Sequence, residues 1–200
     1  LTAAHQFVIK QYTSCWIPDD PEVKLAGLLS DAKGINHLKY IGIQSRFTAN
    51  EDQPKTTDIL VVLSGPEPQR SYLENELLAV LNQLSDCSIR FVRGTNLPQH
   101  QSVSPLINMV NILGSDKLET WIDQSKLLIC RPGYSTLMDL YFKNKEAILI
   151  PTPGQTEQEY LCEYHSVSEG KFTPLLQKNI AGQLPGIISK KLAERHSSKE

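Results

Sequence analysis

Asp58-Ile-Leu-Val-Val-Leu-Ser64 is a continuous apolar run of strand length that stops at Gly65-Pro66. Runs of this kind are typical of strands that are buried on both faces of a parallel sheet. The segment that follows has the apolar spacing of a helix with one buried face, at Leu73, Leu77, Val80, Leu81 and Leu84. Residues 58–84 therefore predict a strand followed by a helix.

The same alternation continues toward the C-terminus. Further strands are expected at 88–92, 109–113, 127–130 and 147–150, and further helices at 117–124, 134–143, 157–164 and 184–195. Strands and helices that alternate at this spacing form right-handed βαβ units. The predicted fold class is therefore α/β, with a Rossmann-like parallel sheet and helices on both faces. The last residues, 197–200, are expected to fray.

Composition excludes several classes of protein. The 200 residues carry 20 Lys and Arg against 22 Asp and Glu, a net charge of −2, so a surface that coats nucleic acid is not expected. No apolar run approaches the roughly 18 residues of a membrane-spanning helix. Four separated cysteines without a C-x-x-C pair indicate reduced, mostly buried thiols in a cytosolic protein, and neither disulfides nor a zinc site.

The N-terminal quarter has a different character from the rest. Its apolar runs are short, and a polar stretch at 48–57 predicts a domain boundary near residue 50. The sequence opens with Leu1 and has no initiator methionine, which is expected of a piece cut from a longer chain. Part of an active site would then lie outside it.

Ligands of parallel sheets bind beyond the carboxyl ends of the strands, so the residues that follow each strand are the candidates. After the first strand, the turn at Ser64 and Gly65 leads into a helix whose first turn carries Arg70. The free N–H groups of a helix N-terminus favour an anion, and a phosphate would offset the unfavourable position of Arg70 there. The alternative is a turn stiffened by proline, with a solvated arginine.

A second turn, at 131–133, follows the strand that ends at Cys130. Ser135 and Thr136 can cap the next helix or offer hydroxyls to a ligand. Asp139 lies one helical turn later, where its carboxylate could accept both hydroxyls of a ribose. The alternative is a capped helix with an aspartate near its positive end.

A third turn, at 151–154, holds two prolines and a glycine that make it rigid. Gln155, Gln158 and Glu159 follow it near the start of a helix and suit the hydroxyls of a sugar. The alternative is a polar first turn in which Thr156 is the N-cap and Glu159 completes a capping box. Together the three turns describe sites for a phosphate, a ribose and a sugar.

Two motifs, 130–139 and 148–160, resemble the C-terminal donor domain of the family 28 glycosyltransferases, a family that includes the N-acetylglucosaminyl transferase that makes lipid II. The resemblance covers roughly residues 40–165, and the turn at 63–70 is similar to a variant in a less characterised bacterial branch. It implies the C-terminal half of a GT-B fold. Residues 1–44 would be the remnant of the N-terminal acceptor domain and the interdomain connection, and residues 45–200 the donor-binding domain.

The resemblance also implies roles for single residues. Asp139 matches the acidic residue that holds the ribose hydroxyls, Gly133 and Thr136 match the turn beside the phosphates, and Arg46 matches a linker arginine that approaches the diphosphate. Gln158 and Glu159 match two glutamines near the donor sugar, and Leu113 lies near the uracil. The expected donor-binding residues are Arg46, Ser64, Gly65, Arg70, Leu113, Arg131, Gly133, Ser135, Thr136, Asp139, Gln155, Gln158 and Glu159.

The sequence departs from the family pattern in four places. Residues 64–67 replace a Gly-Gly-Ser type loop, and Pro132 stands where a serine is usual. Asp139 is one methylene shorter than the common glutamate, and Glu159 replaces a glutamine. The last two changes bear on the identity of the sugar more than on the nucleotide.

The resemblance implies an inverting, metal-independent transferase, without a cofactor, that uses a UDP-linked donor to transfer a hexosyl or N-acetylhexosaminyl group. The acceptor and the catalytic base are not assigned, because the absent domain supplies them in the family, and the fragment alone is expected to be inactive. A cytoplasmic protein is expected, with membrane contact only through the absent domain. The alternatives are a non-catalytic donor-binding module that needs a partner subunit and a sugar-nucleotide epimerase of the same fold.

Overall fold

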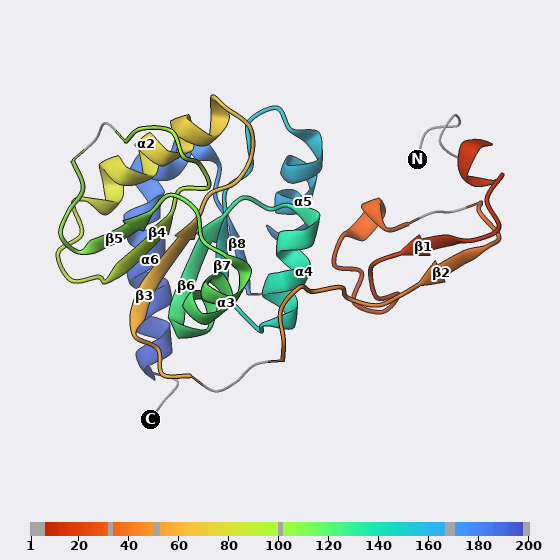
Figure 1. Ribbon diagram of the computed structural model, residues 1–200, viewed down its shortest axis with the longest axis horizontal. Helices are drawn as coiled ribbons and strands as arrows, with labels where there is room; N and C mark the ends of the chain where they lie inside the picture. The colour runs from red at the N-terminus through yellow and green to blue at the C-terminus, as the bar shows by residue number, and fades with distance from the viewer. Residues whose placement is uncertain (1–6, 32–33, 50–52, 100–101, 167–170, 198–200) are drawn as a thin grey trace.

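The computed structural model describes residues 7–31, 34–49, 53–99, 102–166 and 171–197. Its larger part is a parallel sheet of six strands in the order β5-β4-β3-β6-β7-β8 (Figure 1). The strands are β3 (Thr57–Val62), β4 (Ile89–Val92), β5 (Ile107–Val110), β6 (Ser125–Cys130), β7 (Ala147–Leu149) and β8 (Phe172–Pro174). The predicted α/β, Rossmann-like fold class is therefore confirmed.

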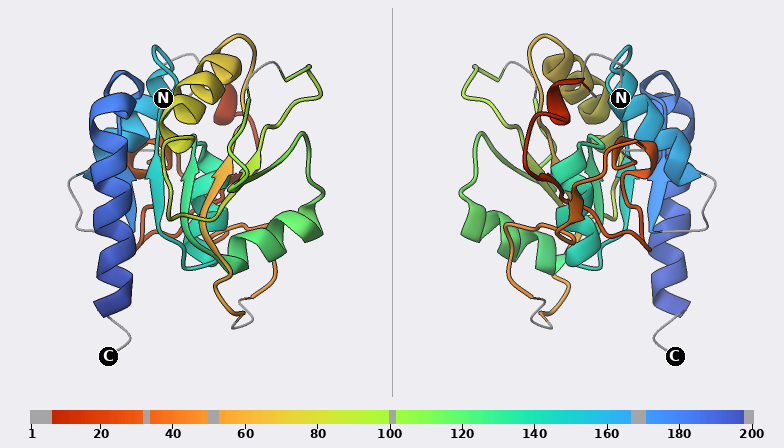
Figure 2. Two further views of the ribbon diagram at one scale, coloured as in Figure 1. Left: turned by 90° about the vertical axis from the view of Figure 1, so that its left-hand side faces the viewer. Right: turned by 90° about the vertical axis from the view of Figure 1, so that its right-hand side faces the viewer.

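Helices cover both faces of this sheet, as the side views in Figure 2 show. They are α2 (Gln69–Leu81), α3 (Ser115–Gln124), α4 (Tyr134–Phe142), α5 (Thr156–Ser166) and α6 (Ile180–Ser197), with a 3₁₀ turn, η2 (Gln177–Asn179), before α6. Alternate residues of β3 serve the two faces: Ile59 and Val61 pack under α2 and α6, and Leu60 packs under α3 and α4. The continuous apolar run is explained by this two-sided burial.

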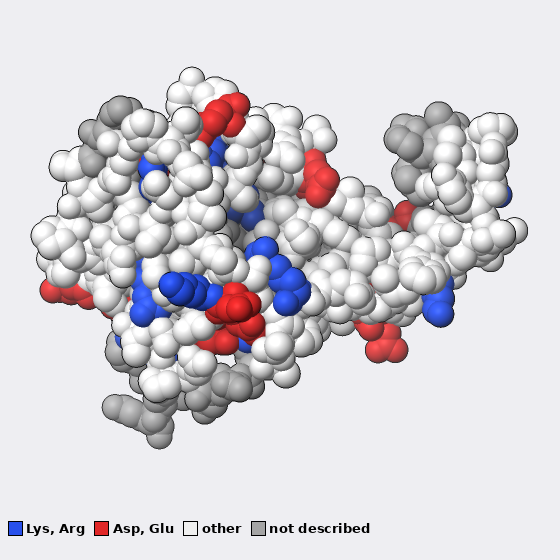
Figure 3. Space-filling view, viewed as in Figure 1, with Lys and Arg blue, Asp and Glu red and all other residues white. Residues whose placement is uncertain are grey.

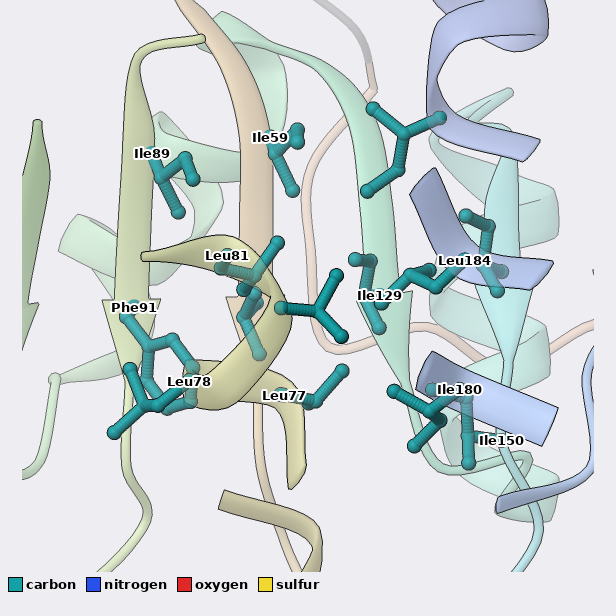
Figure 4. Packing of buried hydrophobic residues seen from close by; sticks show 14 of the residues in the cluster. Ile59, Leu77, Leu78, Leu81, Ile89, Phe91, Ile129, Ile150, Ile180 and Leu184 are labelled. Atoms are coloured by element: carbon teal, nitrogen blue, oxygen red, sulfur yellow. The ribbon is translucent and has the colours of Figure 1, made fainter. Parts of the chain in front are cut away.

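The core on the α2 and α6 side consists of branched aliphatic residues and one phenylalanine (Figure 4). Leu78 and Leu81 of α2 pack toward Ile89 and Phe91, and Leu77 points toward the middle of the sheet. Ile180 and Leu184 of α6 pack against the other half of the sheet, beside Ile129 and Ile150. These apolar side chains fix the height of both helices above the sheet, and thereby the positions of the turns that precede the helices.

Three elements differ from the sequence prediction. β5 lies two to three residues earlier than expected, because its pairing with β4 places Val92 beside Val110 and ends there. β8 was not predicted, because only Phe172 of its three residues is buried. α6 begins at Ile180, four residues earlier than expected, and contains Pro185. Of residues 197–200, which were expected to fray, Ser197 is the last residue of α6 and 198–200 lie outside the described residues.

A smaller unit precedes the sheet. β1 (Cys15–Ile17) and β2 (Leu38–Tyr40) form a separate parallel pair, and a 3₁₀ turn, η1 (Gly27–Leu29), lies between them in sequence. In Figure 1 this unit projects beside α4 and α5. Residues 1–6 and 32–33 of the predicted remnant of residues 1–44 lie outside the described residues.

No helix of the described residues combines the length and the apolar character that crossing a membrane requires. All four cysteines are free, two of them buried (Cys130 and Cys162) and two partly exposed (Cys15 and Cys87). Burial raises the pKa of both Cys130 and Cys162 to about 12, so these two thiols stay protonated. Two of the four thiols are therefore buried, whereas the sequence predicted that most of them would be.

Gly94, which follows β4, holds the turn after β3 in place. Its φ is +72°, and a Cβ at this position would collide with the backbone oxygen of Leu63, one residue before Ser64. We expect Gly94→Ala to lower the free energy of unfolding by about 1–3 kcal/mol, because it combines a left-handed backbone with a backbone clash. Urea unfolding measures this loss, and Gly182→Ala, in an open part of α6, is the control. An equal effect of the two substitutions would contradict this account of Gly94.

Candidate donor site

The three turns singled out in the sequence follow β3, β6 and β7, which are neighbours in the sheet. The strands are parallel, so their carboxyl ends share one edge of the sheet, where ligands of such folds bind. The turn after β3 leads into α2, the turn after β6 into α4, and the turn after β7 into α5. The predicted order of strand, turn and helix is confirmed at all three positions.

Asp139, on the second turn of α4, is only 7% exposed, and both of its carboxylate oxygens are engaged. Its Oδ1 accepts hydrogen bonds from the Ser45 hydroxyl at 2.8 Å and from the Arg46 backbone N–H at 3.2 Å. Its Oδ2 lies 3.1 Å from Nε of Arg46, whose side chain is 57% exposed. Ser45 was not predicted as a site residue, since the contact joins positions 94 residues apart.

A small cavity of about 90 Å³ lies beside this carboxylate. It brings together four of the predicted residues, and its lining consists of Arg46, Phe47, Val62, Ser64, Leu118, Ile122, Leu128, Cys130, Thr136, Asp139 and Leu140. Small-molecule sites in proteins usually measure about 300–1,000 Å³. The cavity is therefore too small for a nucleoside while residues 46 and 47 form its wall.

Arg70 is placed differently from the sequence prediction. It is 2% exposed; its Nε lies 2.6 Å from Glu67, and its Nη1 contacts the carboxylate of Glu74. Burial alone would lower the pKa of Arg70, but the hydrogen bonds that it donates to Glu74 and Glu67 raise it instead. The alternative of a solvated arginine is wrong, and the guanidinium is held inside the fold by ion pairs.

Arg131 also lies inside the fold. Its guanidinium donates to the backbone oxygens of Ile150 and Pro151 at 3.1 and 2.7 Å and to that of Gln69 at 3.2 Å. Burial lowers the pKa of Arg131 to about 10, so it remains charged at neutral pH. Arg131 thus ties the turn after β7 to the start of α2, which is a positioning role.

The helix starts also differ from the capping alternatives. Gly133 is the N-cap of α4, and neither Ser135 nor Thr136 makes a capping hydrogen bond there. At α5, Glu159 accepts from the Gly154 N–H at 2.8 Å and Gln158 accepts from the Thr152 N–H at 2.8 Å. The two side chains hold the third turn in place instead of forming the expected capping box.

The remaining predicted residues are spread around these turns. Ser64, Gly65, Ser135 and Gln155 are exposed, whereas Leu113 is partly buried and packs against the core on the α3 and α4 side. Arg70 and Gln158 do not line the cavity beside Asp139. The structure thus brings Arg46, Ser64, Thr136 and Asp139 together and turns Arg70, Arg131 and Gln158 toward the fold.

A larger cavity, of about 630 Å³, lies between the N-terminal unit and α5. Its lining consists of Lys24, Gly27, Leu28, Ser30, Asp31, Tyr40, Tyr160, Glu163 and Tyr164. The Tyr160 hydroxyl accepts from the Leu28 N–H at 2.6 Å, and the Tyr164 hydroxyl donates to the backbone oxygen of Lys24 at 2.9 Å. None of the predicted donor-binding residues lines this cavity.

The surface shown in Figure 3 has basic and acidic side chains next to each other. Among the described residues, Arg46 lies 3.1 Å from Asp139 and Lys126 lies 2.7 Å from Asp58.

Comparison with known proteins agrees with this architecture. Residues 79–198 match the model of the glycosyltransferase family 28 C-terminal domain. No sequence relative is found among the curated proteins. Among solved structures, the glycosyltransferase of kitacinnamycin is similar in fold, with a TM-score of 0.57 and 11% sequence identity. The similarity covers 96% of this chain and 53% of the other, so the chain spans about half the length of that structure.

The family match covers a different range of residues from the resemblance seen in the sequence, which spans roughly residues 40–165. It begins within α2, includes the turns after β6 and β7, and continues through α6. Arg46, Ser64 and Arg70 lie outside it. Because the matched region is more than half of the chain and contains both motif turns, this protein belongs to the glycosyltransferase family 28 C-terminal domain family.

Proposed function

We propose that residues 45–200 form the donor-binding half of an inverting glycosyltransferase that transfers a hexosyl or N-acetylhexosaminyl group from a UDP-linked sugar. The observation that supports the nucleotide most directly is Asp139. Its carboxylate lies at the edge of the sheet, beside a cavity lined by Ser64 and Thr136, and already accepts from one hydroxyl and one N–H group. A pair of ribose hydroxyls offers the same kind of donors.

The remaining residues suggest how the leaving diphosphate is held. Arg46 lies next to Asp139 with most of its side chain in solvent, and the N-cap of α4 is Gly133, which has no side chain to cap the helix. A guanidinium and the N–H groups of a helix start both stabilise negative charge as it develops on a leaving group. The acceptor oxygen would attack the anomeric carbon from a domain outside this chain, which would also supply the base. No catalytic base is assigned here.

A direct test is the binding of UDP measured by isothermal titration, with GDP and dTDP alongside. We expect UDP to bind and Asp139→Asn to raise its Kd by about tenfold or more, because hydrogen bonds to a charged group contribute roughly 1.5–3 kcal/mol. Asp116→Asn, an exposed substitution in the first turn of α3, is the control and should leave the Kd unchanged. The absence of heat with all three nucleotides at millimolar concentration would contradict the proposal.

A second candidate is a non-catalytic donor-binding module that acts with a partner subunit. It is favoured by the apolar side chains that the N-terminal unit exposes, among them Trp16, which is 65% exposed on β1. A native reading frame that begins near Leu1 would support this candidate. A reading frame that continues upstream by the length of a domain would favour the transferase with both domains in one chain.

A further inference from the structure

The segment that leads into the sheet domain lies directly over Asp139. Ser45 and the backbone N–H of Arg46 both donate to Oδ1, and Nε of Arg46 lies 3.1 Å from Oδ2. The Ser45 hydroxyl is itself fixed, because it accepts a hydrogen bond from the Phe47 N–H at 3.1 Å. Both oxygens of a carboxylate that is almost buried are therefore occupied by the chain itself.

The two ends of this segment are held with different strength. On the C-terminal side, Phe47 is buried in the core, and the N–H and hydroxyl groups of Thr48 donate to Glu119 at 2.8 and 2.7 Å. On the N-terminal side, residues 42–46 are partly or fully exposed, Ile43 contacts the core only through a partly buried side chain, and Gly42 has a φ of +78°. Residues 42–46, here called the latch, can therefore leave Asp139 while Phe47 and Thr48 stay in place.

The latch also limits the space beside the carboxylate. Arg46 and Phe47 form part of the wall of the cavity of about 90 Å³, which holds roughly three water molecules at their volume in the liquid. A ribose that reaches Asp139 must take the place of the Ser45 hydroxyl and the Arg46 N–H. The contacts of the latch and of the ribose with Asp139 thus exclude each other.

We propose that the latch occupies the ribose position as long as no nucleotide is bound. Nucleotide binding then releases the latch and couples donor occupancy to the segment that joins the two parts of the chain. This inference rests on the proposed function, because it needs a nucleotide at Asp139. Release frees the Arg46 guanidinium from its ion pair at the moment when the diphosphate arrives. Since coupling is reciprocal, a displaced latch must in turn raise the affinity for nucleotide.

The test compares UDP binding by Ser45→Ala and Ser88→Ala. Removing the Ser45 hydroxyl weakens the closed latch, and the apparent Kd falls as the competent fraction rises, so we expect the Kd to decrease about three- to tenfold. Ser88→Ala also removes a hydroxyl that donates to a carboxylate, that of Asp58 at 2.8 Å, but Ser88 lies before the start of β4, away from Asp139 and the latch. Its Kd should stay within about twofold of the original.

Hydrogen exchange supplies a second measurement. The Arg46 amide donates to Asp139 in the empty site, so saturating UDP should raise its exchange rate. Suppose that UDP binds. If Ser45→Ala then leaves the Kd unchanged or raises it, or if hydrogen exchange at Arg46 becomes slower, the latch proposal is wrong and the proposed function stands. If neither the original protein nor Ser45→Ala binds UDP, GDP or dTDP, the proposed function fails, and the latch fails with it.

Discussion

Replacing Glu74 by glutamine is expected to lower the free energy of unfolding by about 3–5 kcal/mol, the usual cost of breaking a buried ion pair from one side. Glu74 is buried between two arginines: its Oε1 lies 2.7 Å from Nε of Arg93, and its other oxygen contacts Arg70. Glutamine keeps the shape but removes the charge, and its NH₂ group would face the N–H groups of a guanidinium. Urea unfolding at neutral pH measures the loss.

The matched control is Glu76→Gln on the same helix. Glu76 is exposed and accepts one hydrogen bond, from Gln177 at 3.1 Å, which a glutamine oxygen can also accept. Its effect should stay within about 0.5 kcal/mol, as for most surface substitutions. If Glu74→Gln were as mild as the control, Arg70 would not depend on Glu74, and its sequence interpretation as a phosphate-binding residue would regain support.

The arginines show where sequence reasoning about the site reaches its limit. Arg70 and Arg131 follow strands at the expected edge, and a charge at that position predicts contact with an anion. The structure places both side chains inside, where Glu74 neutralises the first and backbone oxygens surround the second. A sequence gives the position of a charge along the chain but not the direction of its side chain, so the choice between a ligand and an internal partner needs coordinates.

The fold was easier to predict than the site, because it depends on repeated patterns. The apolar runs that became β3, β6 and β7 are buried on both faces and are visible as unbroken stretches of sequence. β8 ends at Pro174, and only Phe172 of its residues is buried, so no run marks it. Pairing with β7 makes it a strand, and such long-range pairing has no local signal.

Asp139 shows what the sequence and the structure each contribute to the candidate site. Its place one turn into α4, after the strand end, was visible in the sequence, and the structure confirms that it lies at the edge of the sheet beside Thr136. Its partner Ser45 was not visible, because nothing in the sequence links residues 45 and 139. The proposed regulation of the site therefore follows from the structure alone, whereas the proposed nucleotide site follows from both.

Replacing Lys143 by methionine is expected to lower the free energy of unfolding by about 3–5 kcal/mol as well. Lys143 follows α4 and is 1% exposed, and its ammonium lies 2.8 Å from Asp123 and 3.1 Å from Glu119. Without it, the buried carboxylate of Asp123, whose Oδ1 has no hydrogen-bond partner among the described residues, would lose its cation. Thermal and urea unfolding would measure the effect.

Loss of the Lys143 ammonium would also affect the donor site, because its Nζ donates to the backbone oxygen of Thr48 at 3.3 Å, at the fixed end of the latch. We expect Lys143→Arg to lose less stability than the methionine variant, because arginine keeps the positive charge beside Asp123 and Glu119. The control is Lys190→Met, since Lys190 is exposed and its pairing with Glu194, at 3.8 Å, should contribute less than about 0.5 kcal/mol. Equal losses for Lys143→Arg and Lys143→Met would show that side-chain shape at this position matters and the buried charge does not.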